Sequence, residues 1–341
     1  MKKIALITGG SGQDGSYLAK FLLEKKYTVV VADRRNSRSD NWRHKYLKIQ
    51  NKLVYEDFDL ADFDSIFRLF RKYKFNEIYN LAAQSFVKSS FETPISTANV
   101  TALGALRILE VIRITQKKTK FYQASSSEMI GNTISKIQNE NSFLSPKSPY
   151  AISKVFAHHI TKNYRESYGI FACSGILFNH ESPLRGEEFV TRKITKGLCE
   201  IKLNKRSFLE LGNLDSERDW GYAGDYVEGM WKMLQQLKPD DFVLATNQTC
   251  SIRDFVNLCC KVLKIEIIWK GKGLKEKGIN LSNNKTIIKI NPRYYRPAEV
   301  HSLKGSYLKA KKKLNWKPKV LLKDLAKLMV NEDMKRLYKN L

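Results

Sequence analysis

The stretch that decides the fold is Ile4-Ala-Leu-Ile-Thr-Gly-Gly-Ser-Gly-Gln-Asp-Gly-Ser-Tyr-Leu18. An apolar run of strand length, Ile4–Ile7, leads into glycines spaced G-x-x-G-x-x-G, and an amphipathic segment, Gly15–Lys25, follows. Glycines let a backbone turn tightly and approach a pyrophosphate, while the amides and dipole of the next helix attract it. An ordinary strand-to-helix turn is the alternative, but this context favours a dinucleotide site.

Residues 1–177 repeat this alternation of short apolar runs and amphipathic segments. We expect strands over 4–7, 28–32, 53–55, 77–81, 120–124 and 171–176, and helices over 15–25, 62–73, 98–115 and 149–166. Strands and helices that alternate with short connections predict an α/β fold with a doubly wound parallel sheet of the Rossmann type. Ligands of such a sheet bind at the carboxyl ends of its strands.

The pattern loosens after residue 177, which predicts a second and smaller unit. We expect a dinucleotide-binding domain over 1–177, joined by part of 221–245, and a smaller C-terminal α/β lobe for the substrate over 178–220 and 246–341. Residues 264–293 are rich in Lys, Gly and Asn, which predicts a loop. Ligand sites favour the cleft between two such units.

The composition excludes several classes of protein. The chain carries 60 Lys and Arg against 34 Asp and Glu, a formal net charge of +26. The basic residues are spread along the chain, and their densest run, Lys309–Lys313, lies in a helix-like segment, so a solvated surface that attracts a diphosphate explains them better than nucleic acid or a membrane. No apolar run reaches membrane-spanning length or forms a signal peptide, and the cysteines lack metal spacing. We therefore expect a cytoplasmic protein without a metal site.

The end of the second strand gives two opposite indications of the cofactor. Asp33 suits the ribose hydroxyls of NAD, whereas Arg34 and Arg35 suit the 2′-phosphate of NADP. The residues leave this choice open. The segments Asp59–Leu60 and Leu81–Ser85 follow later strands, and we expect them beside the adenine and the nicotinamide ribose.

A second signature, Tyr150-Ala-Ile-Ser-Lys154, stands where such a fold places its catalytic centre. On a helix the first and last of these side chains share one face. A phenol has a pKa of about 10, too high for a base at neutral pH, and a neighbouring ammonium lowers it. The pair predicts a tyrosine that takes a hydroxyl proton while hydride leaves the same carbon. For an isolated Y-x-x-x-K the alternative is a surface helix pair.

Upstream, Ala124-Ser-Ser-Ser-Glu-Met129 follows an apolar strand. Ser126 is placed to bind the hydroxyl that Tyr150 deprotonates. Glu128 has two explanations, and the residues alone leave both open. It is either a helix-start carboxylate that faces the dipole, or a second acid and base. Elimination of water requires that second group, and a simple dehydrogenase or 4-epimerase does not.

These residues resemble the extended short-chain dehydrogenases/reductases, and within them the GDP-mannose 4,6-dehydratase family. The resemblance covers nearly the whole chain. Besides the glycine loop and the catalytic motifs, it rests on Asn179-His-Glu-Ser-Pro183, Val190-Thr-Arg-Lys193, Arg218-Asp-Trp-Gly221 and Arg296-Pro-Ala-Glu-Val300. Asp33 departs from the family, which usually has a non-acidic residue at that position.

The resemblance implies a three-step reaction. Tyr150, supported by Lys154 and Ser126, takes the C4 hydroxyl proton while hydride passes to the nicotinamide. Glu128 removes the C5 proton and protonates the hydroxyl that leaves C6 as water. Hydride then returns to C6, so the cofactor ends as it began, stays tightly bound, and the product is a 4-keto-6-deoxy sugar. GDP-mannose is the default substrate; a GDP-linked heptose and GDP-N-acetylglucosamine are further candidates.

Residue patterns and resemblance together imply two sets of ligands. The cofactor set is Thr8, Gly9, Gly12, Gln13, Asp14, Gly15, Asp33, Arg34, Arg35, Asp59, Leu60, Leu81, Ala83, Ser85, Tyr150, Lys154, His180 and Arg185. The substrate set is Ser85, Ser126, Glu128, Asn179, Val190, Lys193, Arg218, Arg296 and Glu299. The resemblance favours NADP(H), and Asp33 leaves NAD(H) open. It also implies a homodimer or homotetramer.

Two other functions are compatible with the fold. One is a nucleotide-sugar epimerase or 4-keto reductase, which would use the same cofactor without eliminating water. The other is a dinucleotide-sensing or nucleic-acid-binding protein, suggested by the charge of +26. The complete set of Tyr150, Lys154 and Glu128 argues against a protein without catalytic activity.

Overall fold

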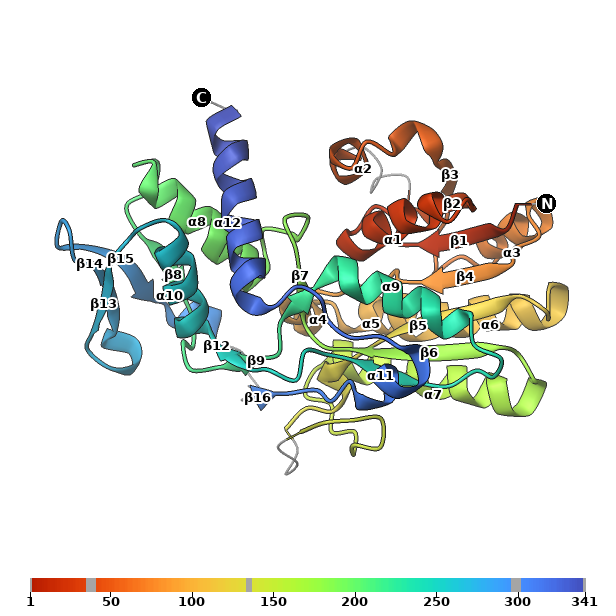
Figure 1. Cartoon of the computed structure of the whole chain (residues 1–341). Coiled ribbons are helices and arrows are strands. Elements are labelled where there is room, and N and C mark those ends of the chain that lie inside the picture. Colours follow the sequence, from red (N-terminus) through yellow and green to blue (C-terminus); the bar gives the residue numbers. More distant parts are fainter. Residues whose placement is uncertain (1, 35–40, 133–136, 296–301, 340–341) are drawn as a thin grey trace.

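The computed structural model describes residues 2–34, 41–132, 137–295 and 302–339. Its centre is a seven-stranded sheet with the order β11-β6-β5-β4-β1-β2-β3, in which every neighbouring pair is parallel (Figure 1). The strands are β1 (Ile4–Thr8), β2 (Thr28–Asp33), β3 (Val54–Asp57), β4 (Glu77–Asn80), β5 (Lys120–Ser126), β6 (Ala172–Leu177) and β11 (Phe242–Leu244). The predicted doubly wound parallel sheet is confirmed.

Helices cover both faces of this sheet because side chains alternate along each strand. On β1, Ala5 and Ile7 pack in one layer and Leu6 packs in the other. The first layer contains α1 (Gln13–Glu24), α9 (Ala223–Leu234) and α11 (Leu308–Leu314), and the second contains α3 (Phe63–Lys72), α6 (Leu103–Thr115) and α7 (Pro149–Tyr168). Both layers are closely packed, so the carboxyl ends of the strands are held in fixed relative positions.

The segment before α6 differs from the single helix expected over 98–115. It runs as α5 (Pro94–Thr97), a π-helical turn (Ala98–Ala102) and then α6. Among the described residues, Pro94–Thr115 is the one helical segment long and apolar enough to cross a membrane by length and composition, with half of the apolar window buried. Its place in a helix layer of the sheet explains that apolar character.

The C-terminal lobe contains a mixed sheet with the order β13-β14-β15-β8. Its strands are β8 (Leu209–Leu211), β13 (Ile267–Lys270), β14 (Lys277–Asn280) and β15 (Lys285–Ile290), and α8 (Val190–Lys202), α10 (Ile252–Val262) and α12 (Leu322–Lys339) pack with it in one core. A buried ion pair of 2.6 Å between Arg192 and Asp333 joins α8 to α12.

The expectation of a loop over 264–293 is therefore wrong. Ile287 and Ile288 of β15 are buried in the core of the lobe. Lys270 of β13, Lys277 of β14 and Lys285 of β15 are exposed. The lysines that suggested a loop are the solvent-facing residues of a sheet with one buried face. β15 also pairs in parallel with β8, a contact that local sequence does not reveal.

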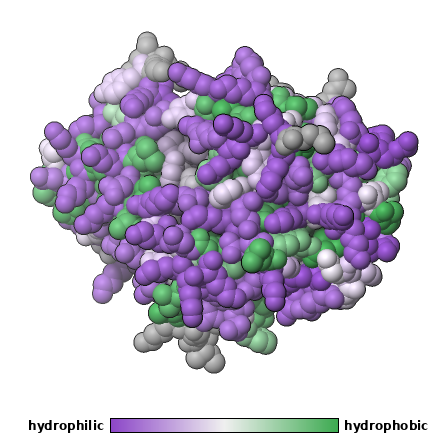
Figure 2. Space-filling model, turned by 45° about the vertical axis from the view of Figure 1, so that its right-hand side comes forward, coloured by the Kyte–Doolittle hydropathy of each residue, from purple (hydrophilic) through white to green (hydrophobic). Residues whose placement is uncertain are grey.

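Short strands link the two units. β7 (His180–Glu181) pairs with β10 (Gly221–Tyr222), and β9 (Glu217–Arg218) lies between β12 (Cys250–Ser251) and β16 (Ser302–Leu303). The short helices α2 (Trp42–Tyr46) and α4 (Val87–Glu92) follow β2 and β4 in the chain. The face seen in Figure 2 is mostly hydrophilic, and its apolar side chains form small separate groups.

Candidate active site

The glycine loop between β1 and α1 is shaped for close approach to a ligand. Gly9 has a φ of +69°, which favours glycine, and a Cβ there would lie 2.8 Å from the backbone nitrogen of Ala82. A Cβ at Gly15 would lie 2.5 Å from Gly10 Cα. Gly12 is the N-cap residue of α1, and because it has no side chain it makes no capping hydrogen bond. These residues fit a dinucleotide, because the amide end of α1 is left for a pyrophosphate.

Side chains behind the loop hold it in place. The Ser11 amide and hydroxyl both donate to the Asp33 carboxylate, at 2.9 and 2.7 Å. His44 Nε2 lies 3.0 Å from the Gly10 carbonyl oxygen, which can only accept, so the ring donates there and accepts from the Tyr55 hydroxyl at Nδ1. Asp33 therefore anchors the glycine loop, a task that does not depend on which cofactor binds.

A cavity of about 670 Å³ opens beside the loop, within the range of small-molecule sites. It brings together most of the expected site residues: Gly9, Gly12, Gln13, Asp14, Gly15, Leu81, Ala83, Ser85, Ser126, Glu128, Tyr150, Lys154, Asn179, His180, Arg185, Val190, Lys193 and Arg218. The glycine loop, both catalytic motifs and the first turn of α8 thus face one space.

Five other expected residues that the structure describes do not line this cavity. Thr8 is fully buried and donates to Asn80 Oδ1 at 2.7 Å, and Leu60 packs in the core. Asp33, Arg34 and Asp59 also lie outside the cavity lining. The remaining three expected residues, Arg35, Arg296 and Glu299, lie outside the described residues.

Helix α7 places Tyr150 and Lys154 on one buried face. The Lys154 Nζ atom lies 5.8 Å from the centre of the Tyr150 ring and donates to the Ala124 carbonyl at 2.7 Å. Burial, opposed in part by the Ser126 hydroxyl and by Arg185, raises the pKa of Tyr150 to about 12. Burial also lowers the pKa of Lys154 to about 8. The structure thus differs from the expectation that the lysine lowers the pKa of the phenol.

The end of β5 presents Ser126 and Glu128 to the same cavity. Ser126 Oγ accepts the amide of Glu128 at 3.2 Å, so Ser126 caps the short helical turn Ser127–Met129. The Glu128 carboxylate is buried at 8% exposure, and its charge is one of the contributions that raise the pKa of Tyr150. The helical turn that contains Glu128 is only 3 residues long, so its weak dipole gives little support to the explanation of Glu128 as a helix-start carboxylate.

A buried ion pair lies on the glycine-loop side of the cavity. His180 Nε2 lies 2.7 Å from Asp14 Oδ2, and His180 Nδ1 lies 2.7 Å from the carbonyl oxygen of Phe178. Both partners accept, so both ring nitrogens donate and the imidazole is protonated. Burial works against both charges, but their mutual attraction prevails, so the pKa of His180 is raised and that of Asp14 is lowered.

The opposite side of the cavity is basic and aromatic. Lys193 Nζ lies 3.2 Å from the centre of the Tyr294 ring, and burial lowers the pKa of this lysine to about 8. Arg218 from β9 is buried and donates to the Glu217 carbonyl at 2.8 Å. Such cations suit a diphosphate. Sequence analysis missed Tyr294, although it stands two residues before the basic motif at 296–300.

Two phenylalanines were missed as well. The rings of Phe86 and Phe189 meet edge to face with their centres 5.9 Å apart, and the Arg185 guanidinium lies 3.5 Å from the centre of the Phe189 ring. Both rings line the cavity. The available signal was their position, since each directly adjoins a motif residue, Ser85 or Val190.

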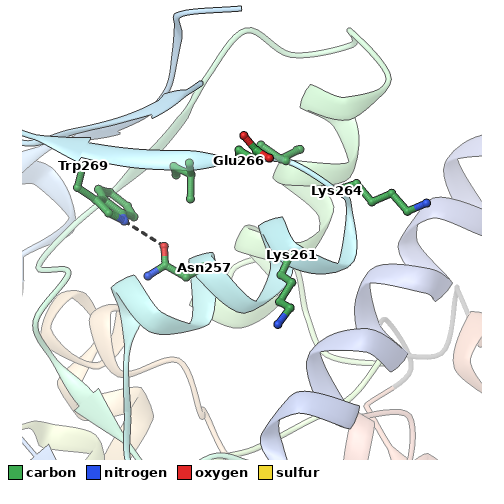
Figure 3. A pocket seen from close by; sticks show the side chains of 7 residues that line it. Asn257, Lys261, Lys264, Glu266 and Trp269 are labelled. Atoms are coloured by element: carbon green, nitrogen blue, oxygen red, sulfur yellow. Dashed lines mark hydrogen bonds between the residues drawn. The ribbon is translucent and has the colours of Figure 1, made fainter. Parts of the chain in front are cut away.

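A second hollow, of about 460 Å³, lies on the C-terminal lobe between α10 and β13 (Figure 3). Trp269 Nε1 donates to Asn257 Oδ1 at 3.0 Å, and Lys261, Lys264 and Glu266 also line the hollow. It contains none of the expected site residues. In the described part of the chain, no cluster of three or more His, Cys, Asp or Glu side chains could hold a metal ion.

Comparisons with known proteins show which family the chain resembles. The family model described as GDP-mannose 4,6 dehydratase matches residues 6–329. The chain is 48% identical to the GDP-mannose 4,6 dehydratase of Drosophila melanogaster, over 99% of this chain and 88% of that protein. It is 47% identical to the GDP-mannose 4,6-dehydratase of Vibrio cholerae, over 98% of this chain and 95% of that protein.

Solved structures share the fold at lower identity. DesIV, a dTDP-glucose 4,6-dehydratase from Streptomyces venezuelae with NAD and TYD bound, matches with a TM-score of 0.83 and 19% identity over 98% of both chains. RMD from Pseudomonas aeruginosa, complexed with NADPH, matches with a TM-score of 0.78 and 19% identity over 98% of this chain and all of that one.

Proposed function

Because the chain belongs to the GDP-mannose 4,6-dehydratase family, we propose that it removes water from a GDP-hexose and forms the 4-keto-6-deoxy sugar. GDP-mannose is the default substrate, with a GDP-linked heptose and GDP-N-acetylglucosamine as further candidates. The observation that carries the proposal is the cavity that Tyr150 and Glu128 share with the glycine loop. Oxidation at C4 and elimination across C5 and C6 need both of these groups within reach of one sugar.

The side chains divide the proton transfers between them. Tyr150 takes the proton of the C4 hydroxyl, which Ser126 holds. The ketone at C4 acidifies the C5 proton, which Glu128 removes, and the same carboxyl group then protonates the hydroxyl that leaves C6. A nicotinamide cofactor bound beside the glycine loop would supply the hydride chemistry at C4 and C6. When hydride reaches C6, C5 regains a proton, which balances the proton that Tyr150 took from the C4 hydroxyl. Buried carboxyls of this kind act as acid and base in turn.

The basic side of the cavity would hold the nucleotide diphosphate. Lys193 and Arg218 supply two cations there, and Asn179 and Val190 line the same wall. Bonds between charged groups and phosphate are short and strong, so this end fixes the GDP while the sugar reaches Glu128. Arg296 and Glu299 complete the set by resemblance.

The cofactor is a nicotinamide dinucleotide, and the family favours NADP(H). Asp33 points instead to NAD(H), because a carboxylate there disfavours a 2′-phosphate. Its two bonds from Ser11 offer another reason for its presence. Denaturing the purified protein and identifying the released dinucleotide by mass spectrometry decides between the two.

The test of the reaction uses Glu128→Gln. We expect dehydration to fall by about 10²- to 10⁴-fold while the cofactor stays bound, since the change removes acid–base chemistry and keeps the side-chain size. The matched control is Glu187→Gln, an exposed carboxylate paired with Lys196. Products from the three GDP-sugars, with no cofactor added, are followed by mass spectrometry for loss of one water. A Glu128→Gln enzyme that dehydrates at the wild-type rate contradicts the proposal, and a product of unchanged mass indicates an epimerase.

We also propose a homodimer that forms through α6 and α7 and works in the cytoplasm. These helices pack together, and Ile114, Ile152 and Phe156 are large apolar side chains that they leave exposed. A second copy of the chain would cover them. Light scattering on the double variant Ile152→Lys, Phe156→Lys should give the monomer mass. The control Leu237→Lys alters an exposed leucine elsewhere and should leave the mass unchanged.

A further inference from the structure

Glu181 is a buried carboxylate to which neither the motifs nor the proposed reaction gives a task. It lies in β7, at the crossing from the sheet to the C-terminal lobe (Figure 1), and is only 2% exposed. Its strand pairs with β10 through Tyr222. A carboxylate removed from water is retained only where charged or polar partners compensate it, so its partners indicate its task.

One oxygen of this carboxylate meets two partners. Glu181 Oε2 lies 3.1 Å from Arg185 Nε and accepts the Thr191 hydroxyl at 2.5 Å. The segment 182–190 therefore folds back, which brings Arg185 and Thr191 to the same carboxylate oxygen of Glu181. If either partner moves, the oxygen loses part of its compensation.

The first partner belongs to the cofactor side of the cavity. The Arg185 guanidinium is stacked on Phe189, and its charge contributes to the lowered pKa of Asp14 in the glycine loop. Its position thus affects the charges that surround a dinucleotide.

The second partner belongs to the substrate side. Thr191 is in the first turn of α8, the helix that carries Val190 and Lys193 into the cavity. The next residue, Arg192, donates to the carbonyl oxygens of Pro183 and Arg185 and pairs with the buried Asp333. The start of α8 therefore moves together with the folded-back loop.

We propose that Glu181 is a positioning residue that couples cofactor binding to nucleotide binding. A nucleotide diphosphate that binds to Lys193 holds the start of α8 in place. Thr191 then fixes Glu181, and Glu181 fixes Arg185 against the cofactor side. Coupling of this kind is reciprocal in the binding free energies, so a bound nucleotide must strengthen the binding of the cofactor, and we expect to measure this as slower release. The inference rests on the proposed function for the identity of the nucleotide.

The experiment measures the release of the resident cofactor from the holoenzyme, with and without saturating GDP. For the wild type we expect GDP to slow release by at least about 5-fold, the lower end of typical coupling. In Glu181→Gln the isosteric amide loses the charge that holds Arg185, so GDP should change the release rate by less than about 2-fold. The control Glu187→Gln removes a carboxylate from the same loop and should behave as the wild type.

A second variant separates coupling from a general loss of structure. Thr191→Val keeps the ion pair of Glu181 and Arg185 but removes the hydrogen bond from α8 to Glu181, while the bonds from Arg192 to the loop remain. It should release cofactor at the wild-type rate without GDP and show less slowing with GDP than the wild type. The proposal is overturned if GDP has no effect on the wild type, or if both variants keep the full effect. Because release is measured without turnover, a protein that fails to dehydrate GDP-mannose but shows the coupling contradicts only the proposed reaction.

Discussion

The glycine loop allows a sharp test with Gly15→Ala. A Cβ at this position would lie 2.5 Å from Gly10 Cα and from the Gly9 carbonyl oxygen, whereas ordinary contact begins at 3.4 Å. Both neighbours are backbone atoms of the loop itself. The loop must therefore move away from α1, which shifts the surface that a pyrophosphate would contact.

The size of the effect follows from two opposing terms. Inserting one methyl group into a tightly packed site costs about 1–3 kcal/mol. Alanine also favours a helix over glycine by roughly 0.5–1 kcal/mol, which offsets part of the cost in the free energy of unfolding. The offset does not help the cofactor, because the displaced atoms belong to its binding loop. A loss of 1–3 kcal/mol corresponds to a dissociation constant about 5- to 150-fold higher.

The control is Gly169→Ala. Gly169 ends α7 with a φ of +67°, and an added Cβ would meet no atom within 4 Å. Left-handed backbone strain costs alanine about 1–2 kcal/mol, so this variant should lose stability and keep its cofactor affinity. Urea unfolding and equilibrium dialysis of the cofactor measure the two quantities. Wild-type affinity in Gly15→Ala, or weakened affinity in Gly169→Ala, refutes the reasoning.

Three further predictions follow from buried groups. Tyr150→Phe should lower dehydration at least about 10²-fold while retaining the cofactor, as mass spectrometry of products and cofactor content will show. Arg192→Leu leaves Asp333 buried without its cation and should lower the free energy of unfolding by about 3–5 kcal/mol in urea. His180→Gln removes a pair in which the histidine stabilises most below its ordinary pKa of 6.5 and Asp14 stabilises most above 3.8. The stability difference from the wild type should therefore be largest between those pH values, and should shrink as pH rises through the higher folded pKa or falls through the lower one.

The sequence predicted the central sheet well because its signals are local. The apolar run Ile4–Ile7, the glycines and the amphipathic helix after them are adjacent in the chain, so the sequence shows all three directly. The prediction of a loop over residues 264–293 was wrong because the features that make this segment a sheet are not local. Its three strands have only one buried face, and the parallel partner of β15 is β8, which lies far away in the sequence.

The candidate site divides in the same way. The motifs predicted which residues gather in the cavity, because glycine spacing and Y-x-x-x-K encode local geometry. The folded-back loop that brings Thr191 and Arg185 to one oxygen of Glu181 has no such pattern. Neither does the contact of Lys193 with Tyr294, which joins positions about a hundred residues apart only through the fold.

The pKa of the catalytic tyrosine shows how burial reverses an argument made from residue types. Burial raises the pKa of Tyr150 to about 12 and lowers the pKa of Lys154 to about 8, so burial opposes the charged form of both side chains. A positive charge nearby would favour the phenolate of Tyr150. An oxidised nicotinamide carries such a charge. Sequence motifs place the two side chains on one helix face, but the pKa values of the two groups depend on the burial and the charges that the folded site provides.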